Sequence, residues 1–243
     1  MICNNILEAM GNTPVIRLNR MVEEDSAEVL VKFEGLNVGG SIKTRTAYNM
    51  ILEAEKAGKI NENTIIVSIA AGQSLEKMSA AFGKDKIKLI RVMPNTPALV
   101  GEGMSAVAPN GNITEEELKT VLDIFSSFGK AETISENLMD TVTAVSGSSP
   151  AYVFMFIEAM ADAAVLAGMP RKQAYEMAAQ AVLGSAKMIL ETGKHPGELK
   201  DMVCSPGGTT LEAVRVLEGH GLRSSVFEAV KACAAHCKKV VDK

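Results

Sequence analysis

The sequence predicts an α/β half followed by an all-helical half, and three observations lead to that fold class. A hydrophobic strand at 64–69, a helix at 74–82 and a buried strand at 87–93 follow one another at the spacing of a parallel strand–helix–strand unit. From about Leu138 onward the pattern changes to long helices. Hydrophobic residues make up 47% and charged residues 22% of the 243 residues, which is ordinary globular composition.

The first sixty residues are expected to form short elements separated by turns. Strands are predicted at 15–18 and 29–33, and a helix at 42–57 that Gly58 ends. A Gly39-Gly40-Ser41 turn precedes that helix. Lys43, just behind the turn, has an amine that could form a Schiff base with an aldehyde cofactor. The spacing alone favours a surface lysine at a helix N-terminus.

Later elements follow from capping and stop signals. Thr114 and Glu117 form a capping-box pattern for a helix that Gly129 closes, and a short strand is expected at 131–134. The segment 101–106 matches the dinucleotide pattern G-x-G-x-x-A, but a Pro-Asn-Gly turn follows at once, which predicts a loop leading into a strand. Helices of the second half are expected at 149–167, at 170–192, after Pro196, from about Thr209 and from about Arg223.

Charge and cysteine content exclude several classes of protein. The net charge of −4 gives no basic footprint for nucleic acid. Cys233, His236 and Cys237 lie in one predicted helix, but no fourth ligand is evident, so no metal site is expected. Four cysteines are too few for a secreted disulfide framework, and a cytoplasmic protein is predicted.

The longest apolar stretch, 151–169, is interrupted by Glu158 and Asp162. It predicts a buried interface helix of a soluble protein, with no membrane partner. The two carboxylates lie one turn apart and could act as an acid–base pair. A capping role or a salt bridge across an interface is the favoured interpretation.

Two loops follow adjacent parallel strands, where open α/β sheets bind ligands. Small residues in the first loop permit close approach of a flat ring, and Asn95 and Thr96 in the second offer hydrogen bonds from a turn between two prolines. Ordinary tight loops are an equally good interpretation. The residues of the two loops are Ala70, Ala71, Gly72, Met93, Pro94, Asn95 and Thr96.

The segment 204–212 predicts an anion seat. Two glycines lead into a helix for which Thr209 and Glu212 make a capping-box pattern. Backbone N–H groups at that helix start, together with the hydroxyls of Ser205, Thr209 and Thr210, suit a small carboxylate. A well-capped helix without a ligand is the alternative.

Four blocks together resemble the pyrroline-5-carboxylate reductase family, in the family's order and spacing over about 180 residues. The resemblance implies reduction of a cyclic imino acid, 1-pyrroline-5-carboxylate, to L-proline with hydride from NADPH or NADH. It also implies a helical half that interlocks two subunits into a homodimer or higher homo-oligomer. One departure is Ser149, where the family usually has glycine. The blocks are Val67–Gly72, Arg91–Pro97, Val145–Tyr152 and Ser205–Thr210.

The resemblance also assigns site residues. By resemblance, the loops Ala70 to Gly72 and Met93 to Thr96 flank the nicotinamide. Thr210 is the first candidate for the catalytic donor to the substrate ring nitrogen. The residues that would hold the substrate are Ser205, Gly207, Gly208, Thr209 and Thr210.

The first sixty residues instead resemble the opening of cysteine synthase, a pyridoxal-phosphate (PLP) enzyme, through segments 11–18 and 39–43. In that family the lysine matching Lys43 holds the cofactor. The sequence departs from the family at Val38 and Thr44, and it contains neither the substrate-gripping Thr-Ser-Gly-Asn-Thr-Gly loop nor the glycine-rich phosphate cradle. PLP binding is therefore not expected, and Lys43 is interpreted as a vestigial cofactor lysine.

These resemblances predict a chimera with a truncated, Rossmann-like parallel sheet and a helical dimerisation domain. Its parts are a cysteine synthase-like fragment (1–60), the second half of a nucleotide-binding α/β domain (61–137) and a helical dimerisation and substrate domain (138–243). The pyrophosphate-binding glycine turn would precede the strand at 64–69, where the cysteine synthase-like segment stands, so impaired NADPH binding and low activity are expected. The alternatives are a non-catalytic helical dimerisation module and, less favoured, a remnant PLP-dependent activity.

Overall fold

A computed structural model describes residues 12–17, 30–32, 43–61, 63–70, 72–82 and 86–241. By its contacts the chain divides into two units, Met1–Thr64 and Ile65–Lys243. The predicted domain boundaries near residues 60 and 137 stay predictions.

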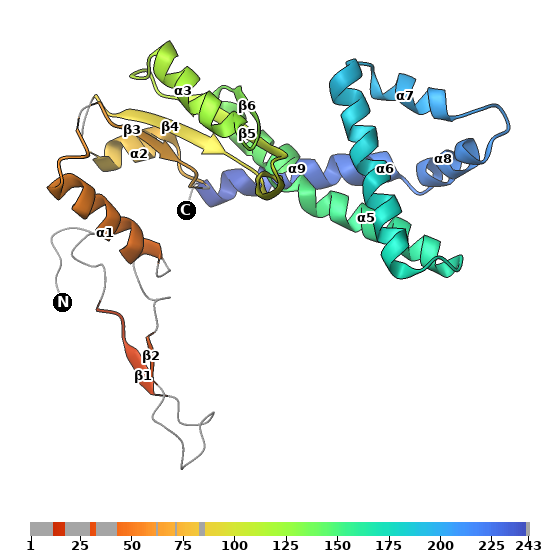
Figure 1. Ribbon diagram of the computed structural model, residues 1–243, viewed down its shortest axis with the longest axis horizontal. Coiled ribbons are helices and arrows are strands. Elements are labelled where there is room, and N and C mark those ends of the chain that lie inside the picture. Colours follow the sequence, from red (N-terminus) through yellow and green to blue (C-terminus); the bar gives the residue numbers. More distant parts are fainter. Residues whose placement is uncertain are drawn as a thin grey trace. The chain divides into compact units, whose positions relative to one another are not determined.

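The first unit contains the short elements that its turns predict (Figure 1). Strands β1 (Val15–Arg17) and β2 (Leu30–Lys32) pair antiparallel, and helix α1 spans Lys43–Lys56. Gly58, with φ of 64°, ends α1 because a left-handed residue lets the Gly58 and Lys59 amides bond back to the last turn. The Gly39-Gly40-Ser41 turn lies outside the described residues.

The second unit begins with a four-stranded sheet of order β3-β4-β5-β6 (Figure 1). The β3–β4 and β5–β6 pairs are parallel, as an α/β fold predicts, whereas β4 and β5 are antiparallel. The elements of this part are β3 (Ile65–Ser68), α2 (Leu75–Phe82), β4 (Lys88–Met93), β5 (Gly103–Pro109), α3 (Glu115–Ser126) and β6 (Gly129–Thr133).

Alternating residues of β4 and β5 supply two cores, one on each face of the sheet, because successive strand side chains point to opposite faces. Ile90 and Val107, fully buried, pack with Val121 of α3 on one face. On the other face Leu89 packs with Leu75 of α2 and with residues further along the chain. Each face of the sheet is therefore covered by one helix that is close to these strands in the sequence, α3 on the first face and α2 on the second.

The apparent dinucleotide pattern at 101–106 does not open a helix. A 3-10 helix, Thr96–Val100, ends at Gly101 with φ of 78°, and β5 begins at Gly103. The prediction of a loop leading into a strand is confirmed. The strand is longer and more buried than expected, because it pairs with neighbours on both sides.

The capping box at the start of α3 is confirmed. The Thr114 hydroxyl accepts from the Glu117 amide at 3.3 Å, and the Glu117 carboxylate accepts from the Thr114 amide at 3.0 Å. Lys88 of β4 also donates to Glu117 at 2.5 Å, which ties the helix start to the sheet. The Lys88 hydrogen bond, reinforced by Thr114, lowers the pKa of the Glu117 carboxyl below its usual value.

Glu117→Gln should remove a pH-dependent part of the stability. A depressed pKa in the folded state stabilises the fold above the unfolded-state value of 4.5, and this contribution is lost as pH falls through the lower folded-state pKa. The free energies of unfolding of the unsubstituted chain and of Glu117→Gln, measured in urea at several pH values, should therefore differ at neutral pH and converge in acid. In a Lys88→Met background the difference should shrink, and an undiminished difference would contradict the assignment to this pair.

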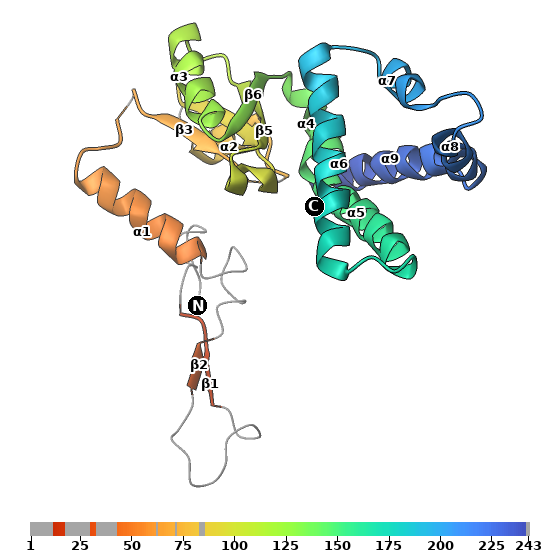
Figure 2. The ribbon, with the colours of Figure 1, turned by 45° about the vertical axis from the view of Figure 1, so that its right-hand side comes forward.

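The remainder of the second unit is helical, as expected (Figure 2). A 3-10 turn, a short helix and a π-helical turn lead into the long helices, of which α5 and α6 pack together through the buried Ala161, Ala174 and Ala178. The elements are Glu136–Leu138 (3-10), α4 (Met139–Val142), Thr143–Gly147 (π), α5 (Ser149–Leu166), α6 (Arg171–Thr192), α7 (Pro196–Val203), α8 (Thr209–Gly219) and α9 (Leu222–Val241).

Within one chain, most of the apolar surface of α5 is exposed. Phe154 is 63% exposed, Met155 68% and Leu166 91%. In length and composition the helical stretch Glu136–Leu166 resembles a membrane span, and only 6% of its most apolar window is buried. Apart from its contact with α6, the expected interface helix therefore has little cover from the described residues of its own chain.

Among the described residues, no hydrogen bond or ion pair joins the two carboxylates of α5, Glu158 and Asp162, as an acid–base pair would require. Asp162 forms an ion pair with Arg171 at the start of α6. The salt-bridge interpretation thus holds for Asp162, but the partner lies in the same chain instead of across an interface.

Candidate functional site

The first candidate loop leaves the sheet at the carboxyl end of β3. The Ala70 amide donates to the Ser68 hydroxyl at 3.3 Å, and Gly72 has φ of 72°, a left-handed conformation that favours glycine. Ala71 lies outside the described residues. Because β3 and β4 are parallel, this loop and the one after β4 emerge at the same edge of the sheet, as the sequence predicts.

The second loop, after β4, is fixed by Asn95. Its side-chain oxygen accepts from the Met104 amide at 2.8 Å, and its side-chain nitrogen donates to the Ser146 carbonyl at 3.2 Å and to the Ser146 hydroxyl at 3.4 Å. The amide group is therefore engaged within the protein, and a role of Asn95 in cofactor binding stays a prediction. Asn95 holds the loop against β5 and the π-helical turn.

Met93 and Gly147 bring two of the sequence blocks into contact. A Cβ atom on Gly147 would lie 2.6 Å from the terminal methyl of Met93, so the glycine leaves room for that side chain. The block that ends β4 and the block that opens α5 are far apart in sequence, yet they form one site. Composition and spacing could not show this contact.

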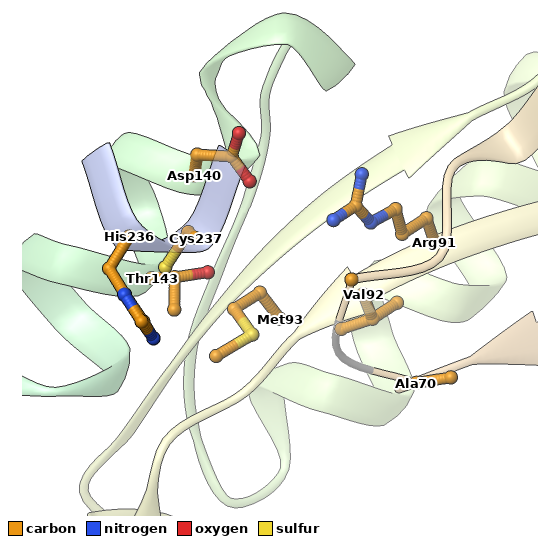
Figure 3. Close-up of a pocket in the computed structure, with 9 residues that line it drawn as sticks. Ala70, Arg91, Val92, Met93, Asp140, Thr143, His236 and Cys237 are labelled. Atoms are coloured by element: carbon orange, nitrogen blue, oxygen red, sulfur yellow. The ribbon is translucent and has the colours of Figure 1, made fainter. Parts of the chain in front are cut away.

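A cavity of about 120 Å³ lies at this edge of the sheet (Figure 3). Ala70, Gly72 and Met93, three of the residues predicted to contact the cofactor, line one side. The other lining residues come from the end of β4, α4, the π-helical turn and α9: Arg91, Val92, Asp140, Thr143, His236 and Cys237.

Sequence reasoning missed the helical wall of this cavity. Asp140 and Thr143 carry no local signal, because neither stands in a motif or next to a strand end. For His236 and Cys237 the sequence suggested only a role as metal ligands. The described residues contain no group of three or more His, Cys, Asp or Glu side chains that could hold a metal ion.

The two thiols of α9 lie in different environments. The Cys233 sulfur lies 3.3 Å from the Ser148 hydroxyl, and a hydrogen bond from this hydroxyl to the thiolate lowers the pKa of Cys233. Burial raises the pKa of Cys237, which lines the cavity. The cavity wall at Cys237 is therefore a neutral thiol at pH 7.

The cavity suits one end of a nicotinamide dinucleotide. Small residues at Ala70 and Gly72 leave space beside the strand ends for a flat ring. Its volume of about 120 Å³ is well below the roughly 300–1,000 Å³ of pockets that enclose a drug-sized ligand. The rest of a dinucleotide would need contacts beyond this cavity.

The predicted substrate segment, Ser205 to Thr210, forms a tight turn followed by a helix start. The Gly208 amide donates to the Ser205 carbonyl at 3.0 Å, Pro206 precedes Gly207, and Gly207 has φ of 69°, the signature of a type II turn. A Cβ atom on Gly208 would lie 2.4 Å from the Ser205 hydroxyl oxygen. The positive φ favours glycine at position 207, whereas a side chain at position 208 would displace the Ser205 hydroxyl.

The capping box predicted at the start of α8 is wrong. Gly208 is the N-cap, Thr209 is already the first helical residue, and no side chain caps this helix within the described part of the chain. Glu212 forms a double hydrogen bond with Arg215 at 2.6 and 2.9 Å, which lowers the pKa of the Glu212 carboxyl. The glycine pair shifts the helix start by one residue, so the first-turn N–H groups have no side-chain acceptor and can receive an anion.

One chain does not bring the substrate segment to the cavity. In both views α8 lies at the opposite end of α9 from the sheet (Figures 1 and 2). The stretch of α9 from Leu222 to Cys237 spans about 22 Å at the helical rise per residue. The residues lining the cavity include none of the segment 205–210.

Lys43 is the first residue of α1, as the sequence predicts. Its side chain is not among those described. Its own unit, Met1–Thr64, contains two short strands and one helix within the described residues.

A sheet with small-residue loops at the carboxyl ends of parallel strands, followed by helices with exposed apolar faces, places the chain among α/β proteins with a separate helical region. The family model "Pyrroline-5-carboxylate reductase dimerisation" matches residues 136–240. A second model, "Pyridoxal-phosphate dependent enzyme", matches residues 6–103 and so extends past the predicted joint near residue 60.

Similar proteins agree with the first model. The chain is 60% identical over 187 residues to a pyrroline-5-carboxylate reductase of Escherichia coli, covering 77% of this chain and 69% of the relative. It is 43% identical to one of Methanosarcina acetivorans, covering 93% and 82%. A crystal structure of Plasmodium falciparum pyrroline carboxylate reductase with NADP bound matches with a TM-score of 0.68 and 36% identity, covering 73% of this chain and 68% of that chain. The chain belongs to the pyrroline-5-carboxylate reductase family.

Proposed function

We propose that this chain is a pyrroline-5-carboxylate reductase-type oxidoreductase, which reduces 1-pyrroline-5-carboxylate to L-proline with NADPH or NADH. The observation that carries the proposal is the meeting of two sequence blocks, Val67–Gly72 and Arg91–Pro97, around one cavity. The second of these blocks, at the end of β4, also meets the block at the start of α5 through the Met93–Gly147 and Asn95–Ser146 contacts. The fold thus assembles the blocks on which the family resemblance rests.

The roles of the residues follow from their placement. When bound, a reduced nicotinamide supplies the hydride. Ala70, Gly72 and Met93 would contact its ring, and the cavity wall would exclude water from that face. The uncapped first turn of α8 holds the substrate carboxylate. Thr210, half-buried, would donate a hydrogen bond to the ring nitrogen of the imine. With hydride delivered to the neighbouring carbon, the nitrogen would take the balancing proton from solvent.

A second copy of the chain completes the site. The exposed apolar face of α5 needs a partner, since contiguous exposed patches of this kind mark interfaces. The span of about 22 Å along α9 keeps the substrate segment away from the cavity of its own chain. In the proposed homodimer the helical part, 138–243, brings one chain's Ser205–Thr210 segment to the partner's cavity.

A non-catalytic dimerisation module is the second candidate. Its support is that the chain has no G-x-G-x-x-G turn in a strand–turn–helix setting for a pyrophosphate. We propose no PLP chemistry: Lys43 stands at the start of α1, but the chain lacks the phosphate cradle that the cofactor requires.

The function is tested on Thr210→Val. Because the hydroxyl is assigned to the substrate ring nitrogen, the variant should weaken imino-acid or proline binding by about 1–3 kcal/mol, the cost of leaving a buried polar group unpaired. Calorimetric titration and NADPH oxidation with the cyclic imine give the two readouts. Thr133→Val, on the exposed end of β6, is the matched control and should bind as the unsubstituted chain does.

Light scattering on the same preparations should give a dimer or a larger homo-oligomer. If Thr210→Val and the control bind the imino acid or proline equally well, the segment Ser205–Thr210 is only a structural turn. A dimer without any NADPH oxidation would support the second candidate, whereas a stable monomer would contradict both.

A further inference from the structure

Glu136 makes two long-range contacts at the cavity. One carboxylate oxygen accepts from the Leu75 amide at 2.6 Å and from the Arg91 guanidinium at 3.2 Å. The three residues stand on different elements: the 3-10 turn before α4, the start of α2 and the end of β4. Glu136 is also the first residue matched by the dimerisation family model.

The carboxylate is well placed to fix the loop that follows β3. Leu75 is the first residue of α2 and is buried, and the loop with Ala70 and Gly72 ends at this helix start. A helix N-terminus favours a negative charge, and a hydrogen bond from a backbone amide to a carboxylate is stronger than one between neutral groups. Holding the Leu75 amide therefore limits the movement of the loop in front of it.

The same carboxylate also fixes the end of β4. The Arg91 side chain is only 11% exposed and lines the cavity two residues before Met93. Its pairing with Glu136 neutralises a nearly buried cation and attaches the end of β4 to the segment that leads into Asp140 and Thr143. One side chain thus connects both strand-end loops to the helical wall.

We propose that Glu136 is a positioning residue for the nicotinamide ring, an inference that rests on the proposed reductase function. It acts through Leu75 and Arg91 and touches no ligand itself. Its position at the start of the helical region couples the geometry of the cofactor loops to that of the dimerising helices.

Two substitutions separate positioning from folding. Glu136→Ala removes the acceptor, and kcat should fall about ten- to hundredfold, because small misplacements of reacting groups are that costly. KM for the imino acid should change by less than about twofold, since the substrate segment is untouched. Glu136→Gln retains a side-chain oxygen for both donors and should recover most of kcat. Asn137→Ala, on the exposed neighbour in the same turn, is the control and should behave as the unsubstituted chain.

Hydrogen exchange provides a readout that does not depend on turnover. In the free protein the Leu75 amide should exchange at least about tenfold faster in Glu136→Ala than in Glu136→Gln, because only the second variant keeps an acceptor. Equal exchange in both variants, or a kcat unaffected by Glu136→Ala, would overturn the inference. If the unsubstituted chain oxidises no NADPH, the proposed function fails, and the exchange rates alone then decide whether Glu136 holds the loop.

Discussion

NADPH should bind this chain at least tenfold more weakly than it binds the Escherichia coli relative, a loss of about 1.4 kcal/mol or more. The loops proposed to contact the nicotinamide lie around the cavity, but the sequence offers no glycine-rich turn at a helix start for the pyrophosphate. Turnover should fall further, by about a hundredfold, because an ångström of misplacement costs that much.

Titration of NADPH fluorescence and steady-state oxidation, on both proteins in one buffer, check this expectation. Micromolar binding with normal turnover would contradict it and would mean that the segment Gly35 to Arg45 supplies the missing contacts. In that event Lys43→Ala should weaken binding, since Lys43 and Arg45 are the cations of that segment.

Gly129→Ala should destabilise the second unit by about 3–5 kcal/mol. Gly129 begins β6 with φ of 151°, a conformation that costs an alanine on the order of 1–3 kcal/mol. A Cβ atom there would lie 2.0 Å from the Gly103 carbonyl oxygen and 2.4 Å from its nitrogen, so the β5–β6 pairing would have to open. Overpacking against backbone adds about 1–3 kcal/mol or more.

Urea unfolding followed by circular dichroism measures this loss against a matched control. Gly111, in the turn before α3, does not have a positive φ, and a Cβ atom added to it would meet no atom within 4 Å. Gly111→Ala should therefore be neutral or stabilise the protein by up to about 1 kcal/mol through the unfolded chain. Equal unfolding midpoints for the two variants would show that the β5–β6 contact is not as tight as described.

The element order was accessible from the sequence because its signals are local. The capping box at Thr114 and the glycine after α1 depend on residues within one turn of the helix ends, and both predictions are confirmed. The same kind of reasoning failed at Thr209, where Gly208 took the N-cap position and left Glu212 to pair with Arg215. A shift of one residue changes which residue is the N-cap. Glycine can take that position although it has no side chain to accept a hydrogen bond.

The site residues also divide into those that local sequence signals place and those that only tertiary contacts explain. The sequence placed Ala70, Gly72 and Met93 at strand ends, and the sheet brings them to one cavity. It could not show that Asn95 uses its amide within the protein, because the acceptors and donors lie on β5 and the π-helical turn. The roles of these residues in cofactor binding remain predictions.

The sequence by itself determined which elements form, which residues are small enough to line a ring-binding loop, and which family the four blocks resemble. These features depend on neighbours along the chain and on side-chain size. Only the tertiary structure decided that β5 runs antiparallel to β4, that α9 separates the substrate segment from the cavity, and that Glu136 joins Leu75 to Arg91. Those contacts connect residues tens of positions apart, where packing and unpaired polar groups, not local preference, select the partner.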